Sequence, residues 1–282
     1  MRWQNNASAV PFEAGGTGAG WPISGPCADL TGAQAIAAQA APAESLAERA
    51  YARLRYALIV GQVIPGQRIT LGALAHQLGT SMTPVRDALS RLAAADALRH
   101  SREIGIIVPV LNRAELDELL RLRLAIEGTA FTNAAMLHRK ADWRCFKLLH
   151  ADLSRVVESD DPVRFAAAAW ALRVAILGLT RSSMLSMFAD RIWCRLGPTF
   201  TQRAANSDVR RQLAFLLGEI VSAIGQRDPE HAHAAVAAEI KAGMNWQPCS
   251  TDREMPAPPL VPGPAVPDRK PRNYVQSGAD HV

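Results

Sequence analysis

The chain has 282 residues, of which 49% are hydrophobic and 20% charged, with a formal net charge of +5. This apolar fraction excludes disorder throughout the chain. No run of about 18 uninterrupted apolar residues occurs, which by this criterion excludes a transmembrane helix. The positive surplus is too small to identify a nucleic-acid binder by itself. The length predicts about two domains, and the abundance of Ala and Leu favours helices.

The two ends of the chain differ in composition from the middle. Residues 1–43 are rich in Gly, Ala and Pro with few charges, which predicts a disordered N-terminal extension. Its polar start is unlike a secretory signal. Residues 246–282 are Pro-rich and predict a disordered tail, for which an idle role is favoured over recognition of a partner. The four cysteines show no paired spacing, which argues against a disulfide framework or a zinc ribbon and favours a reducing cytoplasm.

Residues 44–111 have the pattern of a helix-turn-helix followed by a wing. Apolar spacing predicts a helix from Ser45 to about Val60, and then a second helix that stops at Gly79 and contains Leu71, Leu74, Ala75 and Leu78. A third helix begins near Thr83–Pro84. Two short helices joined by a Gly-containing turn are typical of a helix-turn-helix. Strand-like segments over 97–101 and 105–110 then predict a two-stranded wing that can contact the DNA backbone.

Residues 44–112 contain eight arginines, no lysine and five acidic residues, which gives a surplus of +3. The planar guanidinium suits phosphates and guanine edges better than an ammonium group does. Arg86, near the start of the third helix, is the candidate for a base contact. Ser81 and Thr83 are expected to contact the phosphate backbone at the helix N-terminus.

Residues 112–245 are nearly all helical in period. Capping signals divide them: Asn112 with Glu115 three residues later, Asp161–Pro162, and Asp228–Pro229. Roughly six helices of about 12 to 25 residues are expected, which form an all-α bundle. The predicted fold is therefore mainly α, with an N-terminal winged helix-turn-helix and a C-terminal all-α helical bundle.

The first of these segments resembles the winged helix-turn-helix of GntR-family transcriptional regulators. The matching residues are Leu54–Ile59, Gly61, Pro65–Gly66, Leu74–Ala75, Leu78–Gly79, Thr83–Arg86, Ala88–Leu89, Leu92 and Gly105. Where the family commonly has Ser-Arg-Thr before the Pro, this chain has Ser81-Met82-Thr83, so an apolar side chain replaces an arginine. The expected DNA-binding residues are Arg55, Arg68, Ser81, Thr83, Arg86, Arg91, Arg102 and Gly105.

Residues 112–245 resemble the helical effector domain of the FadR subfamily, the FCD-type domain. Leu119–Glu127 is similar to the Arg-x-x-Leu-Glu segment of its first helix, and Ser222–Pro229 to its penultimate turn. The resemblance implies a cytoplasmic, nucleoid-associated homodimer on a short palindromic operator in double-stranded DNA. It also implies repression relieved by a small molecule, often a carboxylate, and no role for a membrane.

Many effector domains of this subfamily contain what looks like a metal site, built from one Asp and three His. Alignment places Ala169, Arg173, Leu217 and Glu239 at those positions, so none of the three histidines is present. A cation beside a guanidinium is repelled, which predicts no metal and no cofactor. With Arg123, these four residues form the expected effector pocket. Arg173 either binds an anionic ligand or pairs with Glu239, and the sequence leaves both open.

Two other functions remain as alternatives. In one, the helical domain only dimerises a DNA-binding protein and senses no ligand. In the other, it is a ligand-binding or enzymatic module with an incidental helix-turn-helix. An enzyme has no support, because the sequence contains no Gly-rich phosphate loop and no Ser/His/Asp constellation on adjacent elements. The aromatic residues Trp170, Trp193 and Phe200 are expected in the core rather than in a stacking platform.

Overall fold

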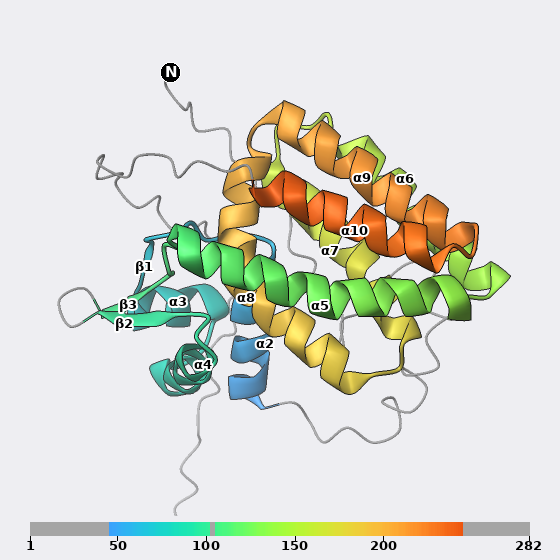
Figure 1. Ribbon diagram of the computed structural model, residues 1–282. Helices are drawn as coiled ribbons and strands as arrows, with labels where there is room; N and C mark the ends of the chain where they lie inside the picture. The colour runs from blue at the N-terminus through green and yellow to red at the C-terminus, as the bar shows by residue number, and fades with distance from the viewer. Residues whose placement is uncertain (1–44, 102–104, 245–282) are drawn as a thin grey trace, which may run out of the picture.

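The computed structural model describes residues 45–101 and 105–244, which form nine helices and three short strands (Figure 1). The predicted N-terminal extension and Pro-rich tail lie outside these residues. The first elements are α2 (Leu46–Ile59), β1 (Arg68–Ile69), α3 (Leu71–Leu78), α4 (Met82–Ala94), β2 (Arg99–Ser101) and β3 (Gly105–Ile107). The remaining elements are α5 (Arg113–Leu137), α6 (Lys140–Val156), α7 (Pro162–Leu179), α8 (Ser183–Ala204), α9 (Ser207–Gly225) and α10 (Pro229–Met244).

The N-terminal elements form the predicted winged helix-turn-helix. Helix α2 begins at Ser45, whose side chain accepts a hydrogen bond from the backbone N–H of Glu48. Gly79 ends α3 in the left-handed conformation (φ 61°, ψ 37°), which glycine adopts at little cost. The apolar face of α4 is buried against α2 and contains Val85, Ala88, Leu89 and Leu92.

The wing is part of a three-stranded antiparallel sheet in the order β1-β3-β2. Strands β2 and β3 match the two predicted segments, with Ser101 opposite Gly105. Strand β1, in which Arg68 lies opposite Ile107, was not predicted. It has only two residues, too few for an alternating hydrophobic pattern to mark it.

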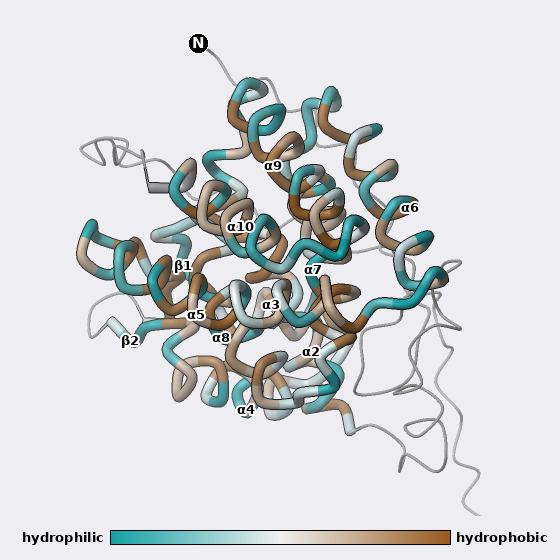
Figure 2. Tube along the Cα trace, turned by 45° about the vertical axis from the view of Figure 1, so that its right-hand side comes forward, coloured by the Kyte–Doolittle hydropathy of each residue, from teal (hydrophilic) through white to brown (hydrophobic). Residues whose placement is uncertain are grey.

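The C-terminal elements are the expected all-α bundle. Asn112 and Glu115 form a capping box at the start of α5, and the Asp161 side chain caps α7 ahead of Pro162. Helix α10 packs against both α5 and α9 (Figure 1). Hydrophilic and hydrophobic residues alternate around the helices in Figure 2, as expected for amphipathic helices around a shared core.

Helix α7 lies at the centre of this bundle. By length and composition alone, this helix of 18 residues could cross a membrane, and its mean hydropathy is 1.4. The uninterrupted-run criterion missed it because Arg164 and Arg173 interrupt the apolar sequence. Since α7 packs against α5, α6, α8 and α9, its apolar character is that of a core helix.

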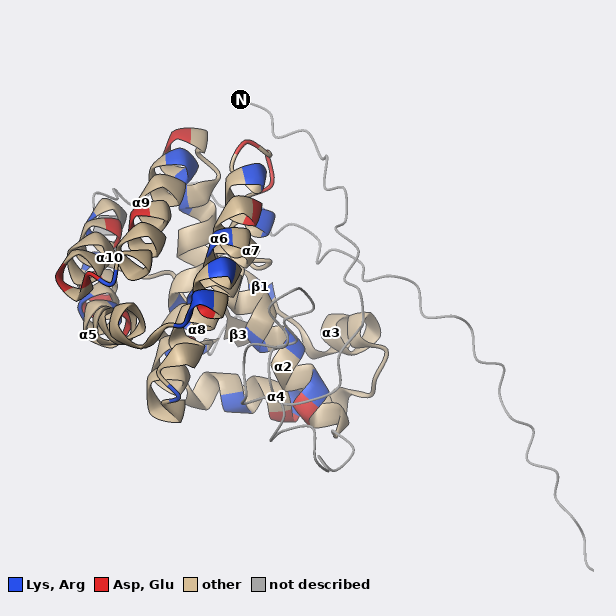
Figure 3. Cartoon of the chain, turned by 90° about the vertical axis from the view of Figure 1, so that its right-hand side faces the viewer, with Lys and Arg blue, Asp and Glu red and all other residues tan. Residues whose placement is uncertain are grey.

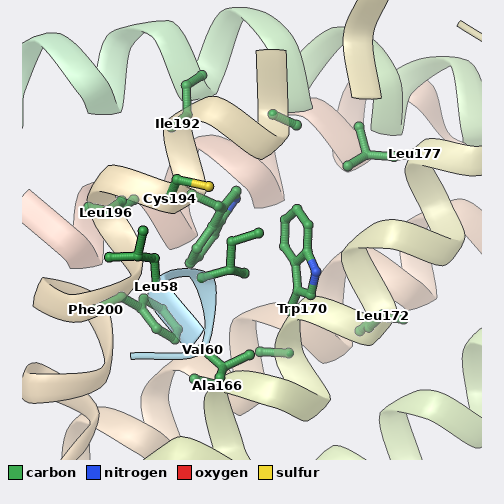
Figure 4. Close-up of a cluster of buried hydrophobic side chains, with 14 of the residues drawn as sticks. Leu58, Val60, Ala166, Trp170, Leu172, Leu177, Ile192, Cys194, Leu196 and Phe200 are labelled. Carbon is green, nitrogen blue, oxygen red and sulfur yellow. The ribbon is translucent and has the colours of Figure 1, made fainter. Parts of the chain in front are cut away.

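The two parts of the fold share one hydrophobic core, which continues from α2 into α8. Leu58 and Val60 lie beside Leu196 and Phe200 in Figure 4. A Cβ atom on Gly197 of α8 would lie only 2.3 Å from the carbonyl oxygen of Ile59, so only glycine allows this approach. The winged domain is therefore packed tightly on α8.

The cysteines depart from the sequence expectation in one respect. Cys194 of α8 is a buried free thiol, whereas Cys145 of α6 is disulfide-bonded. Spacing along the chain reveals cysteine pairs that are close in sequence, whereas a disulfide joins residues that the fold brings together.

Candidate nucleic-acid interface and effector core

The exposed face of α4 is the candidate nucleic-acid interface. Arg86 lies on this face, and no hydrogen bond or ion pair to it is found among the described residues. Thr83 and Ser90 are also exposed beside it. In a helix-turn-helix, the N-terminal part of the second helix contacts base edges. The fold thus presents a guanidinium at the position where such a contact is made.

The N-terminus of α4 leaves its backbone donors available. Ser81 is the N-cap residue (φ −76°, ψ 167°), but its side chain makes no capping hydrogen bond. The first N–H groups of a helix have no intrahelical partner and carry partial positive charge. Ser81 and Thr83, both exposed, therefore lie beside these donors, and their contact with phosphate stays a prediction.

Arg91 is turned away from this face. Its Nη1 lies 2.7 Å from Glu48 Oε1, and its guanidinium lies 4.0 Å from the centre of the Tyr51 ring. The hydrogen bond to Glu48 raises the pKa of Arg91. Because both partners belong to α2, Arg91 joins the two helices rather than extending the surface around Arg86.

Arg55 is likewise engaged within the protein. It forms an ion pair with Asp190 of α8, and only 29% of its side chain is exposed. Burial lowers the pKa of Arg55, but the charge of Asp190 outweighs that effect and the pKa is raised. The structure therefore assigns Arg55 to the joint between the two domains, whereas the sequence had placed it among the DNA contacts.

The remaining predicted DNA contacts belong to the sheet. Arg68 is exposed on β1, and Gly105 begins β3 with φ 90°. Arg102 lies outside the described residues. Arg99 of β2 pairs with Glu115 of α5, so the wing is also connected to the helical domain. Lys and Arg residues on α2 and α4 can be followed in Figure 3.

Inside the bundle, two arginines and two glutamates from three helices form a closed cluster, which we call the effector core. Arg123 and Glu127 lie on α5, Arg173 on α7 and Glu239 on α10, and each is at most 3% exposed. Glu239 binds Arg173 at 2.8 Å and also pairs with Arg123. Glu127 lies 3.0 Å from Arg123 and 3.6 Å from Arg173. Each buried charge thus has opposite charges beside it.

Trp193 of α8 completes the effector core. Its indole N–H donates to Glu127 over 2.5 Å, and the guanidinium groups of Arg123 and Arg173 lie 4.8 and 4.6 Å from its ring centre. Burial raises the pKa of Glu127, but the two arginine charges outweigh burial and hold it below its usual value. Burial lowers the pKa of Arg173, which Glu239 opposes only in part.

The fold brings only some of the predicted pocket residues into contact. Arg123, Arg173 and Glu239 meet, and the carbonyl oxygen of Ala169 accepts a hydrogen bond from Arg173 at 3.1 Å. Leu217 of α9 is fully buried in the hydrophobic core and contributes no polar side-chain atom. Sequence reasoning missed Glu127 and Trp193 as members. The spacing of Arg123 and Glu127, four apart on one helix, was the available signal.

The free space at the effector core is small. A cavity of about 20 Å³ borders Arg123 and Glu239 and is also lined by residues of α5, α8 and α9. A volume of roughly 10–15 Å³ is enough for one water molecule. A metabolite therefore enters only if side chains or helices move. A larger surface hollow of about 380 Å³ lies between α6 and α9, beside His150 and Phe215.

The donor set of the effector core does not suit a metal ion. Of the four positions aligned with the metal ligands of the subfamily, only Glu239 offers a carboxylate, and two guanidinium groups already bind it. Among the described residues, no group of three or more His, Cys, Asp or Glu side chains could hold a metal. Divalent ions need several such ligands.

Helix α8 connects the two candidate sites. One face carries Trp193 and Phe200, whose rings lie 5.1 Å apart beside the effector core. The helix also contacts α2, and the Thr201 hydroxyl donates to the carbonyl oxygen of Val60, the C-cap residue of α2, at 3.1 Å. Helix α8 therefore contacts both the effector core and the winged domain.

A DNA-binding protein with a winged helix-turn-helix and a separate helical domain is the class that this fold defines. Residues 46–108 match the model of bacterial regulatory proteins of the gntR family, and residues 118–242 match the FCD domain. The chain belongs to the GntR family and carries an FCD domain. It is a transcriptional regulator, not an enzyme.

Related proteins support this assignment. The transcriptional regulator McbR of Escherichia coli is 31% identical over 145 residues, which cover 51% of this chain and 66% of McbR. A probable repressor of a D-xylose utilization operon from Paenarthrobacter nicotinovorans is 31% identical over 193 residues, 65% of this chain and 83% of that protein. The solved structure of E. coli McbR/YncC gives a TM-score of 0.66 at 27% identity, covering 71% of this chain and 95% of that one.

Proposed function

We propose that this regulator binds a short palindromic operator as a homodimer and represses transcription until a small molecule releases it. Residues 44–111 bind the DNA, and residues 112–245 pair the protomers and bind the effector. The guanidinium of Arg86 near the start of α4, exposed and without a partner among the described residues, carries this proposal. The name of the P. nicotinovorans relative, a probable repressor, supports repression. The protein acts in the cytoplasm at the nucleoid, without a membrane.

Selection of duplexes from a random library with the full-length protein tests operator binding. We expect a palindromic sequence, because a two-fold symmetric dimer presents two copies of α4. Binding to the selected duplex should weaken steeply with salt, since arginines release counterions from the phosphates. Recovery of random sequences only would contradict the proposal.

The homodimer is tested by light scattering at micromolar concentration. The expected mass is twice the 30.4 kDa of one chain. A palindromic operator requires two binding domains, and a monomer contacts only one half-site. A uniform 30.4 kDa species, with and without operator duplex, would exclude the dimer.

For the effector, we propose an anion, such as a small carboxylate, that competes with Glu239 for Arg173. The Arg173–Glu239 pair supports this chemistry, because Glu239 binds Arg173 through a single Nη2–Oε1 contact of 2.8 Å, and a ligand carboxylate can replace it with a bidentate contact. Thermal-shift measurements over a panel of carboxylates should find one that raises the melting temperature, because a ligand of the native state stabilises it by mass action.

A variant sharpens the effector test. Glu239→Gln removes the internal carboxylate charge but keeps the side-chain size, so it should strengthen carboxylate binding at Arg173. Glu219→Gln is the control, because Glu219 is partly exposed and lines the surface hollow between α6 and α9. It should leave the affinity for the carboxylate unchanged. A ligand affected by Glu219→Gln instead would place the effector between α6 and α9.

The small free volume and the paired charges of the effector core favour a second candidate function. In this alternative, the helical domain only dimerises, and the core residues stabilise it without sensing a ligand. No carboxylate or other metabolite would then shift the melting temperature of the wild type or of Glu239→Gln. Operator affinity would also be independent of every compound tested.

We further propose that the domain works without metal. Its support is the donor set, in which the single aligned carboxylate is held by two arginines. Elemental analysis of protein purified without chelator should find no stoichiometric zinc, nickel or manganese. One bound ion per chain would show that the alignment of these helices with the subfamily is wrong.

A further inference from the structure

Met82 is an apolar side chain on the surface expected to contact DNA. It is the first residue of α4, and 55% of its surface is exposed, whereas Val85, Leu89 and Leu92 of the same helix are buried. A single exposed apolar side chain is common on protein surfaces, but Met82 lies at the end of the helix that contacts base edges in a helix-turn-helix. Ser81, Thr83 and Arg86 surround Met82 in the sequence and are all exposed.

Met82 and Arg86 lie on the same side of the helix. Residues four apart are separated by about 40° around the axis and by about 6 Å along it. Arg91, by contrast, is about half a turn from Met82 around the axis and contacts α2. The part of α4 that can enter a groove thus presents one guanidinium and one thioether side by side.

The two side chains suit different bases in the major groove. A guanidinium donates two hydrogen bonds to O6 and N7 of guanine, whereas an apolar side chain buries the 5-methyl group of thymine. The flexible and polarisable Met side chain adapts well to such a contact. We propose that Met82 is a specificity-determining residue that contacts a thymine methyl group within about two base pairs of the guanine bound by Arg86. This inference rests on the proposed operator binding.

Uracil substitution tests the contact, because uracil differs from thymine only in lacking the methyl group. The operator duplex is first selected with the wild-type protein, and each thymine of one half-site is then replaced in turn. We expect one replacement next to the Arg86-dependent guanine to weaken wild-type binding about fourfold, the value for burying one methyl group.

Variants of Met82 separate the methyl contact from a general loss of affinity. Met82→Ala should weaken binding to the thymine duplex by a similar factor, and the uracil replacement should then have no further effect. Met82→Leu should retain the discrimination. Met136→Ala is the matched control, because Met136 is 53% exposed on α5 within the helical domain.

The outcomes distinguish this inference from the operator proposal. Specific binding that is insensitive to every uracil replacement overturns the thymine contact and leaves the operator proposal standing. Sensitivity that persists in Met82→Ala also overturns it, because another residue then contacts the methyl group. Failure to select any sequence-specific duplex overturns the proposed function itself.

Discussion

Arginine has opposite surroundings in the two functional regions of this molecule. On α4, Arg86 is exposed and lacks a partner among the described residues, whereas Arg173 in the effector core is fully buried against Glu239 and Glu127. An exposed guanidinium retains its hydration and can exchange water for a phosphate or a guanine edge. A buried one is stable only when carboxylates compensate its charge.

This contrast shows where partner binding requires the protein to change. Ser81, Thr83 and Arg86 are exposed on α4, so a ligand can reach them without displacing a partner among the described residues. The charges of the effector core are already paired, so an anionic ligand that binds a guanidinium there competes with the glutamate carboxylates. The first region is suited to recognition by a rigid surface, and the second to a response in which helix positions change.

Breaking the effector core should have the largest effect. Arg173→Ala leaves two buried carboxylates with a single guanidinium between them, and we expect it to lower the free energy of unfolding by about 3–5 kcal/mol. Urea denaturation followed by circular dichroism measures this loss. Arg211→Ala is the control, because Arg211 forms exposed pairs with Glu158 and Asp208 and its removal should barely move the midpoint.

The same measurement identifies the role of Arg173. An unchanged free energy of unfolding in Arg173→Ala, together with loss of the carboxylate response, would mean that Arg173 anchors the ligand and that the pair with Glu239 adds no stability. A strong loss of stability marks the pair as a structural ion pair. In that case, Glu239→Gln is the informative variant for ligand binding.

Separating the two regions at their joint should have the next largest effect. Gly197→Ala inserts a methyl group 2.3 Å from the carbonyl oxygen of Ile59, so α8 and α2 must move apart. We expect a loss of about 1–3 kcal/mol, the usual cost of overpacking. Thermal and urea unfolding measure it.

Gly72→Ala in α3 is the control for this variant, because a Cβ atom there meets nothing within 4 Å. Alanine is the better helix former, so we expect Gly72→Ala to be neutral or to stabilise the protein by up to about 1 kcal/mol. If both variants behave alike, the contact between α2 and α8 is looser than the structure indicates.

In the DNA-binding domain, an exposed and a paired arginine of the same helix, Arg86 and Arg91, can be compared through their effects on DNA binding. Arg86→Ala should reduce the binding free energy for the selected operator by about 1–3 kcal/mol and have less effect on a scrambled duplex. Arg91→Ala should leave the preference between the duplexes unchanged, because Arg91 is held by Glu48 and Tyr51. Fluorescence anisotropy with both duplexes measures this. Equal losses on both duplexes in Arg86→Ala would demote Arg86 to a phosphate contact.

Local signals explain why so much of the fold was predictable. Ser45, Asn112 and Asp161 each cap a helix at the place where the sequence indicated one. These motifs act within a few residues, so the sequence alone contains them. Strand β1 has no such signal, because its two residues become a strand only through pairing with β3.

The candidate sites depend on contacts that sequence spacing does not contain. Arg55 and Arg91 count as basic surface in the sequence, but the fold places Asp190 and Glu48 against them. The alternative in which Arg173 pairs with Glu239 was open from the sequence, and the fold realises that pair. Glu127 joins them because α5 crosses α7 and α8, an arrangement that follows from packing of whole helices.

The smallest expected effect concerns the link between the wing and the helical domain. The hydrogen bond from the Asn112 backbone N–H and the charge of Arg99 hold the pKa of Glu115 below its ordinary value near 4.5. A carboxylate with a depressed pKa adds stability above its unfolded pKa, and this stability is lost as the pH falls through the folded pKa. The melting temperature of Glu115→Gln should therefore be slightly below that of the wild type at pH 7, and the difference should shrink as the pH falls through the depressed folded pKa of Glu115. Glu118→Gln, an exposed change on the same helix, provides the baseline. A difference that stays constant from pH 7 to pH 3 would mean that Glu115 acts through its shape and not through its charge.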